Sequence, residues 1–245
     1  MTVLHVDSLV ARHGLLTAVR EVSLSVGDGE VLALVGANGA GKTTLLRTVA
    51  GAHPVAGGRI LFDGTDISAL PAHKRVAKGL VLVPEGRKLF PEMTVEENLL
   101  VAGARAQPGR WSVDAVLDAF PLLKPLRHKR ASALSGGEQQ ATSIGRALMT
   151  NPRLLLIDEV SLGLAPVAVD MVYQSLASLI GDGATLVLVE QDLQRALSVA
   201  DRVVCMLEGR AVLAAATGEV TREQVTEAYF GLARAGTKST VEDAP

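Results

Sequence analysis

Short apolar runs, separated by glycine and polar turns, mark the first third of the chain as strand-rich. The run at residues 31–35 is apolar throughout, which predicts a buried strand. Residues 44–50 follow it with helical spacing, and Gly51 provides a stop. The predicted strands of this region cover residues 4–12, 19–26, 31–35, 57–64 and 79–83.

The apolar spacing becomes helical between residues 86 and 149. Thr94 and Glu97 form a capping-box pair that opens one helix. Two further helices are predicted over residues 112–120 and 134–149. We therefore expect residues 86–149 to form a helical lobe that has no strand of its own.

Strand and helix patterns alternate again from residue 150, which predicts an α/β core. We interpret residues 1–232 as one domain, in which the core segments 1–85 and 150–232 flank the helical lobe. Residues 233–245 are small and polar, and we expect them to be disordered. The remaining predicted strands are 153–158, 184–189, 202–207 and a short run between Gly209 and Gly218, and the remaining helices are 166–180, 192–200 and one that ends near Tyr229.

Composition and charge exclude several classes of protein. Apolar residues make up 48% of the 245 residues, so a full core can be buried. The 24 lysines and arginines nearly balance 26 acids, and the net charge of −2 argues against a nucleic-acid partner. The basic cluster at residues 124–130 is interpreted as solvated surface. Cys205 is the only cysteine, so it forms no intramolecular disulfide and is expected to pack in the core.

Targeting signals are missing from the sequence pattern. The first residues lack a charged segment followed by an apolar stretch, so no signal peptide is predicted. No apolar run approaches the ~18 residues that can span a bilayer. We therefore expect a cytosolic polypeptide that can dock on a membrane protein.

Residues 36–44 (GANGAGKTT) fit the phosphate-loop pattern G-x-x-x-x-G-K-[ST] and lie between a predicted strand and a predicted helix. The glycines let successive backbone N–H groups turn toward one anion, and the helix start adds partial positive charge. Lys42 can reach the β- and γ-phosphates, and Thr43 can place a hydroxyl on Mg²⁺. The alternative is an ordinary tight turn before a helix, which this strand–loop–helix context disfavours.

Residues 154–159 form an apolar strand that ends in two acids, Asp158 and Glu159. Ligands of α/β sheets gather at the carboxyl ends of strands, so both acids are expected near the phosphate loop. One acid there can hold Mg²⁺, and the other can orient or deprotonate an attacking water. A surface carboxyl pair at a strand end is the alternative.

Residues 134–140 (LSGGEQQ) form a second junction between a glycine loop and a helix, and hence a second anion site. A plain helix start capped by Ser135 is the alternative. The segments 36–44, 134–140 and 154–159, in this order and spacing, resemble the motifs of the ATP-binding-cassette (ABC) ATPases. The resemblance extends over roughly residues 3–232.

This resemblance implies an α/β fold: a P-loop NTPase core with N-terminal antiparallel strands and an inserted helical subdomain. It implies that two cassettes sandwich two ATP molecules head to tail, each between the phosphate loop of one subunit and the LSGGEQQ loop of the other. Residues 161–165 would line the dimer seam. Mg²⁺ contacts fall to Thr43, Glu85 and Asp158, and catalysis to Glu159 and Gln191. The implied ATP contacts are His13, Gly36, Ala37, Asn38, Gly39, Ala40, Gly41, Lys42, Thr43, Thr44, Ser135, Gly136, Gly137 and Glu138.

Several positions depart from the common ABC pattern. Glu85 stands where most cassettes carry glutamine, and Gln191 where most carry histidine. His13 replaces the tyrosine that would stack on adenine, and Val160 replaces a proline. Glutamine offers an amide donor and a carbonyl acceptor but does not titrate, so we expect Gln191 to position phosphate while Glu159 is the base. The alternative is that Gln191 caps the helix that begins near Asp192.

Together with residues 93–99 and 161–166, these departures resemble the second ATPase subunit of branched-chain (hydrophobic) amino-acid importers. Such a subunit uses ATP and Mg²⁺. It pairs with a homologous ATPase subunit, membrane-spanning permeases and a periplasmic or lipid-anchored solute-binding protein.

Four alternatives are weaker. Urea and short-amide importers typically keep the glutamine at position 85. An ABC exporter subunit is poorly separated from an importer by sequence. Non-transport ABC ATPases of DNA repair or translation carry two cassettes or long insertions. P-loop kinases and GTPases lack the LSGGEQQ loop.

Overall fold

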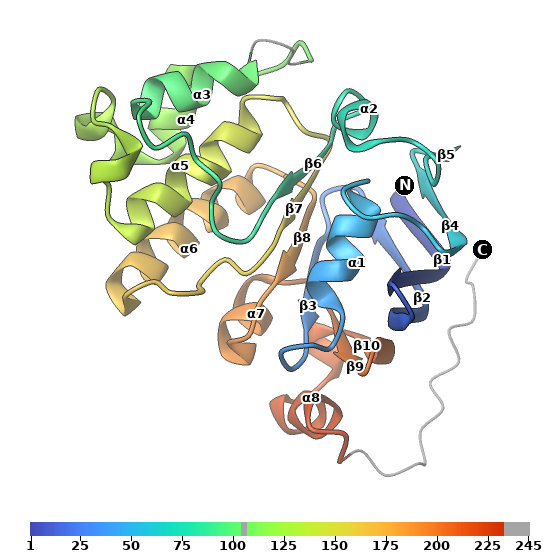
Figure 1. The fold of residues 1–245 in the computed structure, drawn as a ribbon. Coiled ribbons are helices and arrows are strands. Elements are labelled where there is room, and N and C mark those ends of the chain that lie inside the picture. Colours follow the sequence, from blue (N-terminus) through green and yellow to red (C-terminus); the bar gives the residue numbers. More distant parts are fainter. Residues whose placement is uncertain (104–106, 233–245) are drawn as a thin grey trace.

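The computed structural model describes residues 1–103 and 107–232 and confirms the expected α/β fold with two sheets and a helical lobe (Figure 1). The four-stranded sheet has the order β2-β1-β4-β5, and the six-stranded sheet has the order β10-β9-β3-β8-β7-β6. The predicted tail, residues 233–245, lies outside the described residues. None of the helices in the described segments is both long and apolar enough to cross a bilayer.

The four-stranded sheet is antiparallel, and its strands come from the N-terminal part of the chain. Its central strand β1 pairs with β2 on one side and with β4 on the other. Its inner face packs with helix α1 and one face of the six-stranded sheet in a single apolar cluster. The strands are β1 (Thr2–His13), β2 (Leu16–Gly27), β4 (Gly57–Phe62) and β5 (Thr65–Asp66).

The six-stranded sheet is parallel except for β10, which runs antiparallel to β9. Its central strands are buried on both faces, which explains their continuous apolar sequence. Helix α1 (Lys42–Val49) covers one face, and α5 to α8 cover the other. The strands are β3 (Val31–Val35), β6 (Leu80–Val83), β7 (Leu154–Ile157), β8 (Leu186–Val189), β9 (Arg202–Leu207) and β10 (Arg210–Ala216), and the core helices are α6 (Pro166–Gly181), α7 (Leu193–Val199) and α8 (Arg222–Tyr229).

The helical lobe inserts between β6 and β7 (Figure 1) and has no strand among its described residues. The predicted capping box is present: the backbone N–H of Thr94 donates to Glu97 Oε2 at 2.8 Å, and that of Glu97 donates to Thr94 Oγ1 at 3.2 Å. The lobe contains α3 (Val95–Gly103), α4 (Val113–Ala119), the 3₁₀ segments η1 (Pro121–Leu126) and η2 (Ala131–Ala133), and α5 (Gly136–Leu148).

The shortest elements escaped the sequence analysis. Strand β5, helix α2 (Ala72–Val76) and the 3₁₀ segments, including η3 (Thr217–Glu219), are too short to show a periodicity. Cys205 is buried, as predicted. The basic cluster is not simply solvated: Arg127 pairs with Glu96 at 2.5 Å and with Asp114 at 2.9 Å, and so connects α3 with α4.

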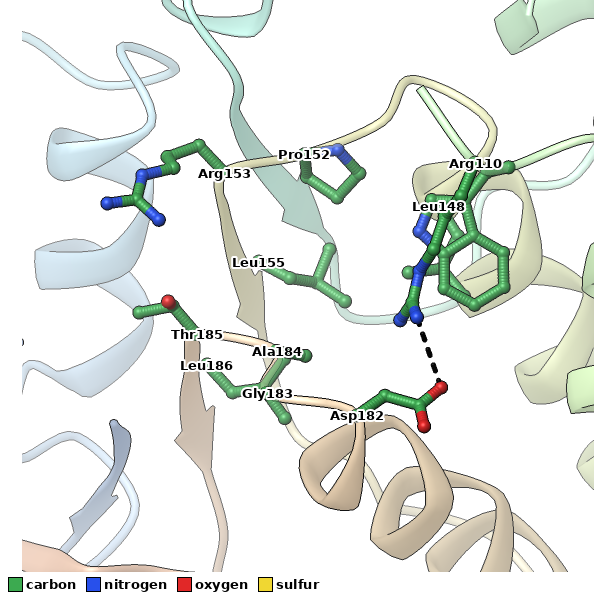
Figure 2. A pocket seen from close by; sticks show the side chains of 11 residues that line it. Arg110, Leu148, Pro152, Arg153, Leu155, Asp182, Gly183, Ala184, Thr185 and Leu186 are labelled. Carbon is green, nitrogen blue, oxygen red and sulfur yellow. Dashed lines mark hydrogen bonds and ion pairs between the residues drawn. The ribbon is translucent and has the colours of Figure 1, made fainter. Parts of the chain in front are cut away.

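Polar contacts join the lobe to the core at the amino ends of β7 and β8 (Figure 2), where residues of both parts line a cavity of about 340 Å³. Arg110 of the lobe pairs with Asp182 of the core at 3.2 Å, and its guanidinium lies 4.7 Å from the centre of the Trp111 ring. The backbone N–H of Trp111 donates to Asn151 Oδ1 at 2.8 Å. These contacts lie at the end of the sheet opposite the phosphate loop.

A buried arginine fixes the far end of α1. Arg75 is only 2% exposed, and its guanidinium donates to the carbonyls of Thr48 at 2.9 Å and Val49 at 2.7 Å. It also donates to the carbonyls of Ser68 and Leu70. The last carbonyls of a helix lack partners within the helix and carry partial negative charge, so a cation stabilises them.

We predict that Arg75→Leu lowers the free energy of unfolding by about 2–4 kcal/mol, because it leaves buried carbonyls without donors. Chemical denaturation measures this change. Arg59→Leu is the matched control, because Arg59 is exposed and pairs with Asp7 at the surface. Equal losses in the two variants would contradict a special role for the buried guanidinium.

Candidate functional site

The phosphate loop joins β3 to α1 at the carboxyl end of the strand. Two of its glycines are required by close backbone packing. At Gly36, whose φ is 145°, an added Cβ would lie 2.2 Å from the carbonyl oxygen of Met206. At Gly41, whose φ is 98°, it would lie 2.3 Å from the carbonyl oxygen of Ala18. Gly41 is also the N-cap of α1, so the helix begins at Lys42, two residues earlier than the apolar spacing indicated.

Lys42 is only 4% exposed and lies over the loop. Its ammonium donates to the carbonyls of Gly36 at 2.6 Å and Ala37 at 3.0 Å. Burial lowers the pKa of Lys42, and the negative charges of Glu159 and Asp158 oppose that shift. The structure therefore brings the loop lysine and both acids of the 154–159 motif into one electrostatic environment.

Asp158 follows β7 directly and accepts a hydrogen bond from Thr43 Oγ1 at 3.0 Å. The residue is 2% exposed. Burial raises the pKa of Asp158 to about 6; the Thr43 hydrogen bond opposes this shift, and the charges of Glu159 and Glu85 add to it. The acid that sequence reasoning placed on the Mg²⁺ side is therefore beside the predicted hydroxyl.

Thr43, Asp158 and Glu85 offer the hydroxyl and carboxylate oxygens that Mg²⁺ prefers. Among the described residues, no group of three or more histidine, cysteine or acidic side chains could hold a metal by itself. This donor set fits Mg²⁺, which usually binds one or two carboxylates and completes its shell with phosphate oxygens and water. Glu85 lies on the exposed loop after β6, and its charge adds to the rise in the pKa of Asp158.

Glu159 and Gln191 are in direct contact. The side-chain amide of Gln191 donates to Glu159 Oε2 at 2.9 Å. Glu159 has a φ of 51°, a left-handed conformation that costs a non-glycine residue about 1–3 kcal/mol. Asp192, not Gln191, is the N-cap of α7, because its side chain accepts from the backbone N–H of Arg195. The alternative that Gln191 merely caps this helix is therefore wrong.

Sequence reasoning missed Glu190, which precedes Gln191 and is 1% exposed. Its carboxylate accepts from the backbone N–H and the hydroxyl of Ser161 at 3.0 and 2.8 Å. It also accepts from the backbone N–H of Gln191 at 3.1 Å. An acid at the end of an apolar strand was the available signal, but it was used only for the strand that ends at Asp158.

The LSGGEQQ segment begins α5 in the lobe and does not belong to the cluster around Lys42. Ser135 and Glu138 form a reciprocal capping box, with the Ser135 N–H donating to Glu138 Oε2 at 2.7 Å. A Cβ on Gly137 would lie 2.6 Å from the Ala168 side chain, so close packing on α6 requires glycine there. Arg87 donates to Gln139 at 3.1 Å, a contact that the sequence did not indicate.

The remaining predicted contacts surround the loop. His13 ends β1, and its Nε2 lies 3.2 Å from Thr44 Oγ1. Its ring centre lies 4.5 Å from that of His53, for which no role was predicted. Within the loop, Ala40 is buried and its N–H donates to the Ala37 carbonyl, whereas Asn38 and Gly39 are exposed.

Known proteins share sequence with this chain over most of its length. The family model described as "ABC transporter" matches residues 19–161, which is more than half of the chain. BraG of Pseudomonas aeruginosa, a high-affinity branched-chain amino acid transport ATP-binding protein, is 42% identical over 92% of this chain and 98% of its own. LptB of Haemophilus influenzae, a lipopolysaccharide export system ATP-binding protein, is 32% identical over 94% and 98%.

Solved structures share the fold over nearly the same length. A nucleotide-free ATP-binding cassette from an ABC transporter has a TM-score of 0.80 and 28% identity, covering 93% of this chain and 95% of that one. An ABC-transporter cassette in its ADP conformation has a TM-score of 0.76 and 28% identity, covering 94% and 95%. The resemblance inferred from the sequence motifs is thus confirmed: this chain belongs to the ABC transporter family and is one of its nucleotide-binding ATPase cassettes.

Proposed function

We propose that this chain is the ATP-hydrolysing subunit of an importer for branched-chain or other hydrophobic amino acids. The observation that carries the proposal is the 42% identity with BraG over 98% of BraG's length. An exporter subunit is the second candidate, because the lipopolysaccharide-export protein LptB is 32% identical over a similar span. The ten-point difference in identity favours import.

The phosphate-binding step follows from the loop. The N–H groups of residues 36–41 and the start of α1 attract the phosphates, and Lys42 neutralises their charge. Thr43 and Asp158, 3.0 Å apart, would hold Mg²⁺ together with Glu85. Mg²⁺, when bound, supplies positive charge to the phosphate oxygens. His13, beside Thr44, would stack its ring on adenine.

Hydrolysis is assigned to Glu159 as the general base, which accepts the proton of the attacking water. The Gln191 amide, 2.9 Å from Glu159 Oε2, holds this carboxylate in place. Its carbonyl oxygen is an acceptor, and the side chain cannot titrate. Gln191 therefore positions the base and the γ-phosphate but does not transfer a proton.

The LSGGEQQ segment is assigned to the ATP of a second cassette, because it lies on the lobe and not in the cluster around Lys42. Residues Ser135 to Glu138 would contact the γ-phosphate bound by the partner subunit, and residues 161–165 would line the seam of the head-to-tail dimer. The proposed assembly contains a homologous ATPase subunit, two permeases and a periplasmic or lipid-anchored solute-binding protein, with this chain on the cytoplasmic face.

We predict that cells lacking this chain regain uptake of labelled leucine when the wild-type chain is supplied, but not when Lys42→Ala is supplied. Loss of the Lys42 charge removes phosphate neutralisation. Lys74→Ala, at an exposed lysine, is the control and should restore uptake. Recovery of leucine uptake with Lys42→Ala would contradict the ATPase assignment. If the wild-type chain restores uptake of urea but not of leucine, the solute assignment is wrong. If cells lacking the chain fail to export a solute but show no uptake defect, the chain does not serve import.

The role of Gln191 predicts a graded series in ATP hydrolysis by the assembled transporter. Gln191→Ala should lower kcat by about 10- to 100-fold, because the base is no longer held. Gln191→His should retain activity, whereas Gln191→Glu should be poor because a carboxylate would face both Glu159 and phosphate. Glu159→Gln is the reference for a missing base and should still bind ATP. Full activity of Gln191→Ala would contradict the positioning role.

The raised pKa of Asp158 predicts a gain in stability when its charge is removed. The pKa of Asp158 is about 6 in the folded chain, compared with the ordinary value of 3.8. The folded chain therefore keeps a proton that the unfolded chain loses, and the fold becomes less stable as the pH rises from about 4 to about 6. Asp158→Asn should raise the free energy of unfolding by up to ~3 kcal/mol above pH ~6 and by nothing below pH ~4, while abolishing hydrolysis.

Denaturation at several pH values measures this gain. Asp170→Asn, at an exposed carboxylate paired with Arg195, is the control and should change stability by less than ~0.5 kcal/mol. A pH-independent or negative effect of Asp158→Asn would contradict the assignment of a buried, charge-bearing ligand.

A further inference from the structure

We propose that Glu190 is a positioning residue for ATP hydrolysis. Its buried carboxylate connects the loop after Glu159 to Gln191 by hydrogen bonds, and so keeps the Gln191 amide in contact with the Glu159 carboxylate. The proposal rests on the roles proposed above for Glu159 and Gln191. It concerns a side chain that neither the phosphate-loop motif nor the two-acid motif includes.

The contacts of Glu190 form a closed ring. From Glu159 the backbone runs through Val160 to Ser161, whose N–H and hydroxyl both donate to Glu190 at 3.0 and 2.8 Å. The backbone then leads from Glu190 to Gln191, whose side chain donates back to Glu159 Oε2 at 2.9 Å. Movement of either loop must therefore break a hydrogen bond.

The charge of Glu190 makes these bonds strong. A carboxylate that is 1% exposed is costly to bury unless donors surround it, and three donors do so here. All three face it as N–H or O–H groups, and hydrogen bonds to an ionised acceptor are the stronger kind. Its negative charge also reaches Lys42, whose ammonium it favours. The carboxylate is thus built into the same charged cluster as the phosphate loop.

The backbone of Glu159 explains why such a tie is needed. A φ of 51° is rarely adopted by a side chain of this size, and it persists only where neighbouring contacts fix it. Val160, the next residue, is 1% exposed and packed, and Ser161 is held twice by Glu190. The backbone of Glu159 is therefore fixed on its C-terminal side by the Ser161–Glu190 hydrogen bonds, and its carboxylate is fixed by the Gln191 amide.

Glu190→Gln tests the tie with little change in shape. An amide keeps one acceptor oxygen, and its NH₂ must face either the Ser161 N–H or the Gln191 N–H, so at least one backbone hydrogen bond is lost. We expect kcat of the assembled transporter to fall about 10- to 100-fold, while KM for ATP stays within about threefold. Ser161→Ala should lower kcat less, and the double variant should resemble Glu190→Gln alone because both act through one contact.

Glu30→Gln is the matched control. Glu30 is also a hydrogen-bonded carboxylate of low exposure, paired with Arg202 at 2.9 Å, but it lies at the amino end of β3. It should leave kcat near the wild-type value. Equal kcat losses in Glu30→Gln and Glu190→Gln, or a wild-type kcat in Glu190→Gln, would overturn the proposal.

Hydrogen–deuterium exchange separates this inference from the proposed function. Glu190→Gln should accelerate amide exchange in peptides covering residues 158–165 and 189–193, and Glu30→Gln should not. Unchanged exchange would overturn the proposal even if activity fell. A wild-type chain that never hydrolyses ATP would contradict the proposed function, and faster exchange in Glu190→Gln alone would then still support the tie.

Discussion

The parallel pairing of β3, β7 and β8 is the constraint on which the rest of the site depends. Leu34 pairs with Val189, and Ile157 pairs with Leu188. The residues that follow these strands therefore leave the sheet at the same edge, as the carboxyl ends of parallel strands must. A slip of one residue in any strand would turn its side chains to the opposite face and separate the phosphate loop from its acids.

The same edge concentrates charge on buried side chains. Lys42, Asp158 and Glu190 are each less than 5% exposed. Electrostatic interactions are stronger in such an environment, and groups fixed by packing do not have to reorganise when charge develops on a ligand. This burial lowers the stability of the folded chain, because it disfavours the charged forms of Lys42 and Asp158. The glycines at 36 and 41 permit this close packing because they let the loop backbone approach β9 and β2.

Among the described residues, α1 and α5 both begin in glycine-rich segments, but of these two only the start of α1 is part of this charged cluster. The N-terminus of α1 adjoins Asp158 and Glu159, whereas that of α5 lies in the lobe, where Gly137 packs on α6. The lobe inserted between β6 and β7 shares a buried apolar cluster with the core and also contacts it through polar pairs, among them Arg110 with Asp182 (Figure 2). This division accounts for the proposed use of the second loop by a partner cassette.

The sequence by itself determined the motifs and all but the shortest elements. Buried strands, the Thr94 capping box and the loop around Lys42 depend on neighbours within a few residues, and such short-range patterns are visible in a linear chain. Only the tertiary structure decided which distant groups meet. Three hydrogen bonds join residues that are far apart in the sequence. The Glu190–Ser161 pair is separated by 29 residues, the Gln191–Glu159 pair by 32, and the Arg75–Thr48 pair by 27. No periodicity encodes these contacts, because they arise from the register of the sheet and the packing of helices against it.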